Sequence, residues 1–352
     1  MKQLDRKKTI QTLALVGSSM RLWGEKQAES AFHPFVAGSY FEQINEVIER
    51  ERHHNGWFTP ETVRYSLEQW GRSLTEEKLE QWLQSYQVAT NPKKVGVIMA
   101  GNIPLVGFHD FLSVLLAGHL PIIKMSRDDD RLLPQFLELI LELQPELKSR
   151  IETVDQLKGI DAVIATGSNN TARYFEKYFG HLPCIIRKNR TSLAVLTGTE
   201  TKDELTALGA DIFQYHGLGC RNVSHLMIPD SFDLNEFFGA IVDYGSIIYH
   251  NKYANNYDYY KAIYLMNQEE IIENGFVLMR PSSDLFAPIG VLHFQRYETM
   301  DAVRHYIEWY KDDLQVVVGR DFTPFGQAQN PALDDYADNV NTMSFLQGLS
   351  TT

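Results

Sequence analysis

The sequence predicts an α/β fold built on a parallel sheet, and three observations lead to this fold class. Between about residues 91 and 198, short apolar runs alternate with helical patterns. The apolar runs are nearly continuous, which is typical of strands that are covered on both faces. The composition, 44% hydrophobic and 22% charged over 352 residues, suits a soluble chain with one large domain or two. Together these observations predict helices on both faces of a mostly parallel sheet.

The first part of the chain, residues 1–90, is expected to be helical. Apolar residues recur at three- and four-residue spacing in "SYFEQINEVIERERHH" and "TEEKLEQWLQSY". In "TPETVRYSLEQWGRSL", a threonine N-cap is followed by Pro60 and Glu61 in the first turn, which favours a helix start. We expect this segment to pack on the sheet domain that follows it.

Strands and helices then alternate along the chain. Strands are predicted in "KVGVIMAGN", "LPIIKMS", "GIDAVIATGS", "PCIIRKN" and "TSLAVLTG", with helices in "FHDFLSVLLAGH", "RLLPQFLELILELQ" and "NNTARYFEKYF". These are followed by a helix in "KDELTALGADIFQYH", a loop with Cys220 and a strand in "SHLMIP". A second α/β region then contains a strand at Ile289–Phe294. The predicted parts are therefore residues 1–90, 91–198 and 199–330, with a tail at 331–352.

The charge and composition exclude several classes of protein. The formal net charge of −12 would repel phosphate-rich polymers, so no nucleic acid is expected as a partner. No stretch approaches the roughly 20 apolar residues of a membrane span. The apolar patch near the N-terminus is short and charged residues follow it at once, which does not suit a signal peptide. Two cysteines give neither a disulfide framework nor a metal cluster, so no metal is expected and the cytoplasm is the expected location.

Two polar motifs follow predicted strands, at the end where parallel sheets bind ligands. In "AGNIP", Asn102 could donate a hydrogen bond to an oxygen that becomes negative during acyl chemistry. The alternative is a turn before Pro104. In "IIKMS", Lys124 could reach a ribose or a phosphate, and the alternative is a solvated strand end.

Two further motifs could face a nucleotide cofactor. In "ATGSNNT", Gly167 and Ser168 begin a helix, and helix N-termini bind phosphates or polar ring substituents. This is not the G-x-G-x-x-G pattern, so a standard Rossmann dinucleotide loop is not predicted. In "SSDLFAPIGV", Asp284 could hold a ribose and Phe286 could lie against a cofactor ring; otherwise the stretch is a loop that enters a strand.

The loop with Cys220 is the candidate centre of chemistry, and two interpretations stay open. The glycines of "GLGC" let the backbone adopt unusual dihedral angles and let a ligand approach, which burial alone would not need. Arg221 could favour the nucleophilic thiolate, and His216 could act as a base. On this stretch alone, Cys220 could equally be a small buried apolar residue. Cys184, in an apolar strand, is expected to belong to the core.

The order of these motifs along the chain resembles that of the aldehyde dehydrogenase superfamily, over about residues 95 to 330. The resemblance implies an aldehyde dehydrogenase-like fold, with a parallel-sheet cofactor-binding domain at 91–198 and an α/β catalytic domain at 199–330. It implies Cys220 as the nucleophile and Asn102 as the donor to the oxyanion. It also implies three sets of cofactor contacts. Lys124 and Ser126 would contact the adenosine ribose, and Thr166, Gly167 and Ser168 would lie along the cofactor. Asp284 and Phe286 would contact its nicotinamide side.

One difference from the superfamily's motifs points to a particular family within it. A Glu-Leu-Gly-Gly-Lys segment usually supplies the glutamate that activates water, but the corresponding stretch here, "CIIRKNRTSLAVL", has no carboxylate. A thioester on Cys220 would then lack its hydrolytic base. The basic residues of this stretch, Arg187, Lys188 and Arg190, could help to bind a phosphate-bearing substrate. With its short length, the chain resembles the acyl-CoA reductase family typified by the fatty acid reductase of bacterial luminescence (LuxC-like).

The resemblance implies NADPH-dependent reduction of a fatty acyl-CoA thioester to the fatty aldehyde through an acyl-cysteine. One alternative is an NAD(P)-dependent aldehyde dehydrogenase in which Glu200 or Glu204 activates water. The other is a degenerate, non-catalytic member that binds acyl chains or a partner enzyme. The stretch "KMSRDDD" offers both Arg127 and three aspartates, so the sequence does not separate NADPH from NADH. Acyl-CoA is the expected partner, and a homo-oligomer or a partner acyl-transfer enzyme stays open.

Overall fold

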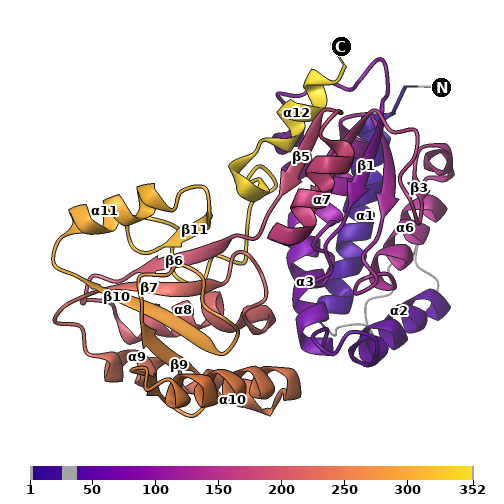
Figure 1. Cartoon of the computed structure of the whole chain (residues 1–352). Helices are drawn as coiled ribbons and strands as arrows, with labels where there is room; N and C mark the ends of the chain where they lie inside the picture. Colours follow the sequence, from indigo (N-terminus) through magenta and orange to yellow (C-terminus); the bar gives the residue numbers. More distant parts are fainter. Residues whose placement is uncertain (1–2, 26–37, 351–352) are drawn as a thin grey trace. The chain divides into compact units, whose positions relative to one another are not determined.

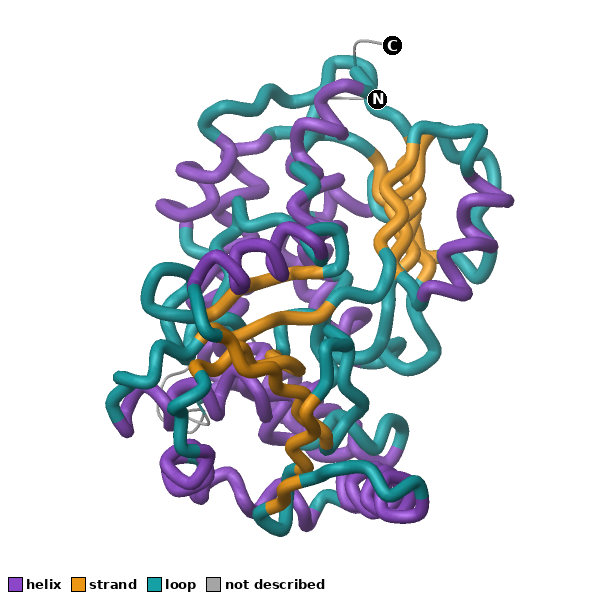
Figure 2. The backbone as a smooth tube through the Cα atoms, turned by 60° about the vertical axis from the view of Figure 1, so that its left-hand side comes forward, coloured by secondary structure: helices purple, strands orange, loops and turns teal. Residues whose placement is uncertain are grey.

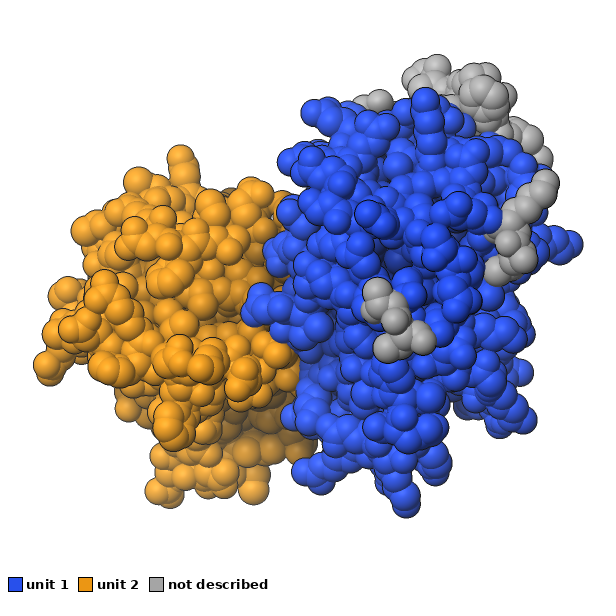
Figure 3. All heavy atoms as spheres, turned by 90° about the horizontal axis from the view of Figure 1, so that it is seen from above, with its two compact units in different colours: residues 1–188, 332–352 blue, residues 189–331 orange. Residues whose placement is uncertain are grey.

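The computed structural model describes residues 3–25 and 38–350. The chain forms two compact units (Figure 3): the first holds residues 1–188 and 332–352, and the second holds residues 189–331. Each unit has its own sheet. The second unit is therefore an insertion within the chain of the first.

The first unit is built on a five-stranded parallel sheet with the order β3-β2-β1-β4-β5 (Figure 1). The chain adds strands on one side of β1 and then crosses to the other side, so the strand order reverses between β1 and β4. Ligands bind outside the carboxyl ends of strands at such a reversal. The strands are β1 (Lys94–Ile98), β2 (Leu120–Lys124), β3 (Glu152–Thr153), β4 (Ala162–Thr166) and β5 (Cys184–Arg187).

Helices cover both faces of this sheet (Figure 2). On one face, the N-terminal helices share a single hydrophobic core with the sheet and with the helices that follow β1 and β2. On the other face, α7 packs through Phe175 and Phe179. The helices are α1 (Arg6–Gly24), α2 (Gly38–Arg50), η1 (Glu51–His53), α3 (Pro60–Ser73), α4 (Glu76–Leu83), α5 (Phe108–Leu116), α6 (Leu132–Leu143), η2 (Pro145–Ser149) and α7 (Asn169–Phe179).

The C-terminal segment belongs to the first unit. It contains η5 (Ala337–Asn339) and α12 (Thr342–Gly348). The indole Nε1 of Trp82 donates to the hydroxyl of Tyr336 at 2.8 Å, and Nε2 of His119 lies 2.8 Å from the carbonyl oxygen of Leu346. Residues 332–349 therefore complete the core that the N-terminal helices begin.

The second unit has a six-stranded sheet with the order β11-β6-β7-β10-β9-β8, parallel except at the β8–β9 edge. One hydrophobic core, with side chains from α8 and α9, lies on one face, and a core with side chains from α11 lies on the other (Figure 1). The strands are β6 (Thr191–Val195), β7 (Val223–Pro229), β8 (Ile272–Glu273), β9 (Leu278–Pro281), β10 (Val291–Tyr297) and β11 (Leu314–Val318). The helices are α8 (Lys202–Phe213), η3 (Gln214–Gly217), α9 (Leu234–Ala240), η4 (Val242–Tyr249), α10 (Asn251–Met266) and α11 (Met300–Trp309).

Three boundaries differ from those expected from the sequence. The change of unit falls between Lys188 and Asn189 rather than at residue 198, because β6 pairs with β7 and β11 in the second sheet. The strand expected at Ile289–Phe294 starts at Val291, because Pro288 and Gly290 form a turn just before it. α8 ends at Phe213, three residues before the end of the predicted helical stretch. None of the helices in the described residues is long and apolar enough to cross a membrane.

Candidate functional site

Three of the predicted motifs lie at one edge of the first sheet. Because β2, β1 and β4 are adjacent and parallel, their carboxyl ends share this edge. The register pairs Ile98 with Lys124 and with Ala165, so Lys124 lies at the level where β1 ends, and Asn102 and Thr166 follow that level. The edge lies at the reversal of strand order, where open α/β sheets bind their ligands.

The loop after β1 carries Asn102 at the surface, and the buried carboxylate of Asp129 accepts a hydrogen bond from its backbone. Leu105 has a left-handed backbone (φ 58°), and its N–H donates to Oδ2 of Asp129 at 2.8 Å. Asp129 is buried, and this burial raises its pKa to about 7 although the hydrogen bond from Leu105 opposes the shift. Asn102 itself is exposed. The asparagine therefore stands on a loop whose strained backbone is fixed by a neighbouring element.

The loop after β2, which carries Ser126, packs against the Asn102 loop. A Cβ atom at Gly101 would lie 2.6 Å from Oγ of Ser126, so the close approach of the two loops requires glycine at this position. Oγ of Ser126 accepts a hydrogen bond from the N–H of Asp128 at 3.3 Å. Lys124, at the end of β2, is half-buried. Two of the predicted motifs thus form one continuous surface.

The third motif joins β4 to α7. Ser168 is the N-cap of α7, and its Oγ accepts from the N–H of Thr171 at 3.3 Å. The N–H of Gly167 donates to the carbonyl oxygen of Arg187 at 3.2 Å. The N-terminus of α7, which carries partial positive charge, therefore opens at the same sheet edge as Lys124.

In the second unit, Cys220 follows a sharply turned segment. Tyr215 (φ 53°), His216 (φ 57°) and Gly217 (φ 80°) are three consecutive residues in the left-handed region. Each non-glycine residue in this region costs on the order of 1–3 kcal/mol and keeps this conformation only where the surrounding structure holds it. Strain of this kind gathers at functional sites, and here it ends three residues before the candidate nucleophile.

Asn222 links the two sides of this turn, and the sequence did not single it out. It is buried, and its Nδ2 lies within hydrogen-bond distance of three carbonyl oxygens, those of Asp211 (3.1 Å), Ile212 (3.1 Å) and Gln214 (2.8 Å). Its Oδ1 accepts from the N–H of Gly219 at 2.8 Å. The only hint in the sequence is an asparagine two residues after the cysteine, a residue type common in turns. Its amide ties the end of α8 to the residue before Cys220.

Cys220 itself is half-buried, so the residue as a whole is not enclosed in the apolar core. Oγ of Ser192 donates to the carbonyl oxygen of Cys220 at 3.0 Å, which holds the backbone of the loop from β6. His216 and Arg221, which were predicted to act on the thiol, have contacts elsewhere. The ring of His216 lies 4.1 Å from that of His250. Nη1 of Arg221 lies 3.4 Å from the carbonyl oxygen of Ala328.

Asp284 and Phe286 lie in the loop between β9 and β10. Asp284 is exposed, and Phe286 is 42% exposed. The main-chain oxygen of Asp284 accepts hydrogen bonds from His225 and His293, two buried residues that the sequence did not single out. The side chains of Asp284 and Phe286 are thus exposed, whereas the backbone of Asp284 is anchored.

The suggestion that the basic residues at the end of β5 and just after it bind phosphate is wrong for Arg187. Its guanidinium is buried, forms an ion pair with Asp110 on α5 and donates to Oγ1 of Thr342 at 2.9 Å. The ammonium of Lys188 lies 2.9 Å from a carboxylate oxygen of Glu176, and Arg190 donates to the carbonyl oxygen of Leu314 at 3.0 Å. Arg187 is a structural residue because its charge is enclosed and neutralised within the first unit.

Replacing Arg187 with methionine should lower the free energy of unfolding by about 3–5 kcal/mol, because it leaves the Asp110 carboxylate buried without its partner. Urea denaturation followed by circular dichroism measures the change. The double variant Asp110→Val with Arg187→Met should recover part of the loss, since neither charge remains. As a matched control, Lys188→Met removes an exposed pair and should cost less than about 1 kcal/mol. Equal losses for the two single variants would contradict this account.

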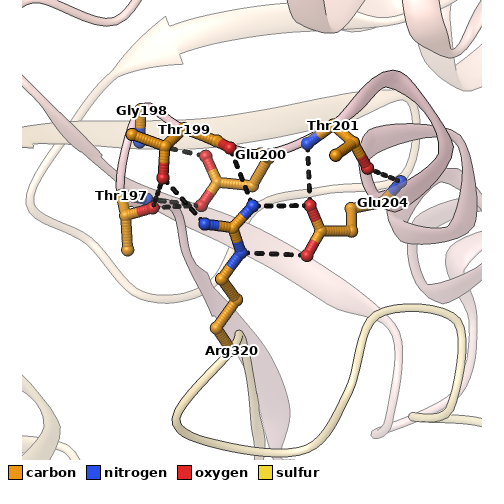
Figure 4. Close-up of polar contacts among 7 residues, drawn as sticks. All are labelled: Thr197, Gly198, Thr199, Glu200, Thr201, Glu204 and Arg320. Atoms are coloured by element: carbon orange, nitrogen blue, oxygen red, sulfur yellow. Dashed lines mark hydrogen bonds and ion pairs between the residues drawn. The ribbon is translucent and has the colours of Figure 1, made fainter.

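The two glutamates considered as activators of water are engaged in local structure (Figure 4). Oε1 of Glu200 accepts from the N–H and the hydroxyl of Thr197, both at 2.7 Å, and Oε2 accepts from the N–H of Gly198 at 3.0 Å. Glu204 accepts from the N–H of Thr201 in a capping box at the start of α8.

Glu204 also forms a two-point ion pair with Arg320. Nε and Nη2 of the guanidinium lie 2.9 and 2.7 Å from the two carboxylate oxygens (Figure 4). The hydrogen bond from Arg320 lowers the pKa of Glu204 to about 2. A general base works best with a pKa near the pH of the reaction, so Glu204 is poorly suited to remove a proton from water.

Comparison with known proteins places these features in context. A family model described as Acyl-CoA reductase (LuxC) matches residues 37–244, more than half of the chain. No curated protein matches the chain.

Solved structures share the fold at low sequence identity. A putative aldehyde dehydrogenase from Burkholderia cenocepacia has a TM-score of 0.62 at 14% identity, over 92% of this chain and 80% of its own. Aldehyde dehydrogenase 21 from Physcomitrella patens has a TM-score of 0.61 at 11% identity, over 96% and 84%. Indole-3-acetaldehyde dehydrogenase, solved in complex with NAD+, has a TM-score of 0.58 at 12% identity, over 89% and 76%. These matches confirm the predicted aldehyde dehydrogenase-like α/β fold.

Proposed function

Because the chain belongs to the acyl-CoA reductase (LuxC) family, we propose that it reduces an acyl-CoA thioester to the aldehyde with NADPH, through an acyl-cysteine on Cys220. Family and fold together make the chain an oxidoreductase of the aldehyde class. The observation that carries the finer proposal is the half-buried Cys220 at the end of a strained turn that Asn222 fixes. A cysteine with only a packing role would need neither the strain nor the anchor.

The proposed reaction proceeds through the protein thiol. The Cys220 thiolate attacks the thioester carbonyl, and the amide of Asn102 and the N–H of Cys220 donate to the oxyanion. The bond to CoA breaks, CoA leaves as its thiolate, and the acyl group stays on Cys220. Hydride addition to the acyl carbon gives a thiohemiacetal, which collapses to the aldehyde and returns the thiol. The order of the motifs along the chain supports assigning Asn102, from the first unit, and Cys220, from the second, to one reaction.

The carboxyl edge of the first sheet suits a nucleotide cofactor. Its groups are the Lys124 ammonium, the hydroxyls of Ser126 and Ser168 and the N-terminus of α7, which together match ribose hydroxyls and phosphates. When bound, NADPH supplies the hydride. We propose that Thr166 and Gly167 line the same cofactor and that Asp284 and Phe286 meet its nicotinamide side. Both cysteines are thiols, which fits the reducing cytoplasm as the site of this reaction.

The second candidate function, oxidation of an aldehyde to the acid, needs a carboxylate that activates water. The engagement of Glu200 and Glu204 argues against this role for either. We therefore expect Glu204→Gln to leave the rate of aldehyde formation within about twofold of the wild-type rate, while the loss of the ion pair with Arg320 lowers the thermal midpoint. Steady-state kinetics and a melting curve measure the two effects. A collapse of activity at an unchanged midpoint would instead make Glu204 part of the chemistry.

Product analysis tests the proposed function. The chain is incubated with saturated acyl-CoA thioesters of graded length, with NADPH or NADH, and the aldehyde and free acid are separated and quantified. We expect aldehyde, released CoA and oxidised cofactor in equal amounts, with acid formed much more slowly. A second arm supplies aldehyde and oxidised cofactor without CoA and should give little acid. Rapid acid formation in either arm would favour the aldehyde dehydrogenase, and the absence of both cofactor binding and turnover would favour a non-catalytic subunit.

A further inference from the structure

Two consecutive main-chain oxygens in the loop between β9 and β10 each lie within hydrogen-bond distance of two side chains. Asp284 O lies 3.0 Å from Nδ1 of His225 and 2.8 Å from Nδ1 of His293. Ser283 O accepts from the hydroxyls of Tyr306 at 3.1 Å and Tyr310 at 3.3 Å. We call this group of four donors the loop clamp: His225, His293, Tyr306 and Tyr310.

The two histidines meet because of strand pairing. β7 and β10 are adjacent parallel strands, and their register places His293 directly opposite His225, so both side chains leave the same face of the sheet. Their rings are 6.4 Å apart and nearly perpendicular, at 89°. This arrangement lets both Nδ1 atoms reach the one carbonyl oxygen of Asp284.

The protonation of both rings follows from their contacts. A carbonyl oxygen only accepts hydrogen bonds, so each Nδ1 carries the proton. Burial lowers the pKa of His225 to about 4 and also lowers the pKa of His293, so both imidazoles are neutral at physiological pH. Nε2 of His293 is then an acceptor, and Nη1 of Arg280 lies 3.5 Å from it. Arg280 is itself held by Glu269 at 2.6 Å.

Tyr306 comes from α11, and Tyr310 is the C-cap residue that directly follows this helix, which packs on the same face of the second sheet. Tyr306 and Tyr310 are one helical turn apart, and their rings contact each other at 4.7 Å. Burial raises the pKa of Tyr306, so its hydroxyl keeps the proton that it donates. The clamp thus joins two strands and a helix to a segment of two residues.

We propose that the loop clamp is a positioning device for the cofactor side of the site: it fixes the Ser283–Asp284 backbone and so orients the Asp284 carboxylate and the Phe286 ring. This inference rests on the proposed function of that loop. Buried imidazoles are costly unless they are hydrogen-bonded, and apolar side chains would pack the two strands at lower cost. The polar donors of the clamp converge on the one segment of the loop that leads directly to the exposed Phe286.

The test compares two substitutions at His293. His293→Leu removes the donor, whereas His293→Asn keeps an N–H donor close to the position of Nδ1. We expect His293→Leu to raise the KM for NADPH about tenfold and to lower kcat, with the KM for acyl-CoA changed less than about twofold. His293→Asn should restore most of the loss. His305→Leu makes the same change at an exposed histidine of α11 and is the matched control.

Hydrogen exchange of the peptide that contains residues 282–287 gives a readout that does not depend on activity. We expect faster exchange in His293→Leu and in Tyr306→Phe, which removes a single hydroxyl and is the milder variant if His293→Leu does not fold. Unchanged exchange in both would overturn the clamp. Faster exchange with an unchanged KM for NADPH would overturn its positioning role. A wild-type chain that shows no reductase activity and binds no nicotinamide cofactor would instead overturn the proposed function, and the exchange data would still decide whether the clamp exists.

Discussion

Cys220→Ala is expected to abolish acyl-CoA reduction. Removal of the nucleophile from a comparable covalent enzyme costs on the order of 10⁶ in kcat, so we expect turnover to fall to the detection limit. The thermal midpoint should change little, because Cys220 is only half-buried and the contact from Ser192 is made to its backbone oxygen. The measurement is NADPH oxidation that depends on acyl-CoA.

The other cysteine of the chain provides the matched control. Cys184 is also half-buried, but it belongs to β5 of the first unit and not to the strained turn. Cys184→Ala should keep the wild-type rate. A covalent acyl adduct, detected by mass spectrometry after a single turnover without NADPH, should be found on Cys220 and be absent in Cys220→Ala. Near wild-type turnover by Cys220→Ala would remove the acyl-cysteine from the mechanism.

Asn102→Ala should lower kcat by about 10²–10³-fold, the effect typical of losing one donor to an oxyanion. Because the donor acts mainly on charge that develops in the transition state, the KM for acyl-CoA should change far less than kcat. Asn102 is exposed, so we expect the unfolding midpoint to move little. Single-turnover measurement of acyl transfer to Cys220, followed without NADPH, separates this step from reduction.

Two comparisons separate loss of the amide from disturbance of the loop. Asn102→Asp has nearly the same shape but brings a negative charge to the oxyanion, so its rate should be no higher than that of Asn102→Ala. Asp129→Ala leaves Asn102 in place but removes the acceptor for the N–H of Leu105, so it should lower both kcat and stability. If Asn102→Ala retained wild-type kcat, the N–H of Cys220 and groups other than this amide would have to stabilise the oxyanion.

The sequence predicted the sheet edge of the first unit well, for a physical reason. Parallel strands that are buried on both faces read as continuous apolar runs, and their carboxyl ends share one edge. The positions of Asn102, Lys124 and Ser168 along the chain were therefore enough to place all three at that edge. The assignment of the β6 segment was less accurate, because an apolar run does not reveal which sheet it will join, and its partners β7 and β11 lie far along the chain.

The residues that hold the candidate site in place could not be predicted from the sequence, because they depend on contacts between distant segments. His225 and His293 become a pair only when β7 and β10 align in register. The residue types of Tyr215 and His216 do not predict two consecutive left-handed residues, so the helical pattern appeared to continue to the end of "QYH"; the hydrogen bonds of Asn222 connect the backbone on the two sides of this turn. Both features arise from tertiary contacts that override local preference.

The return of residues 332–349 to the first unit has a consequence for how the chain matures on the ribosome. Strands β1 to β5 are made early, yet the guanidinium of Arg187 meets the hydroxyl of Thr342 only after the whole inserted second unit has been translated. Until then, the surface that Leu346 and Leu349 cover stays open to water or to a chaperone. The unit whose synthesis begins first is thus the unit whose core is completed last.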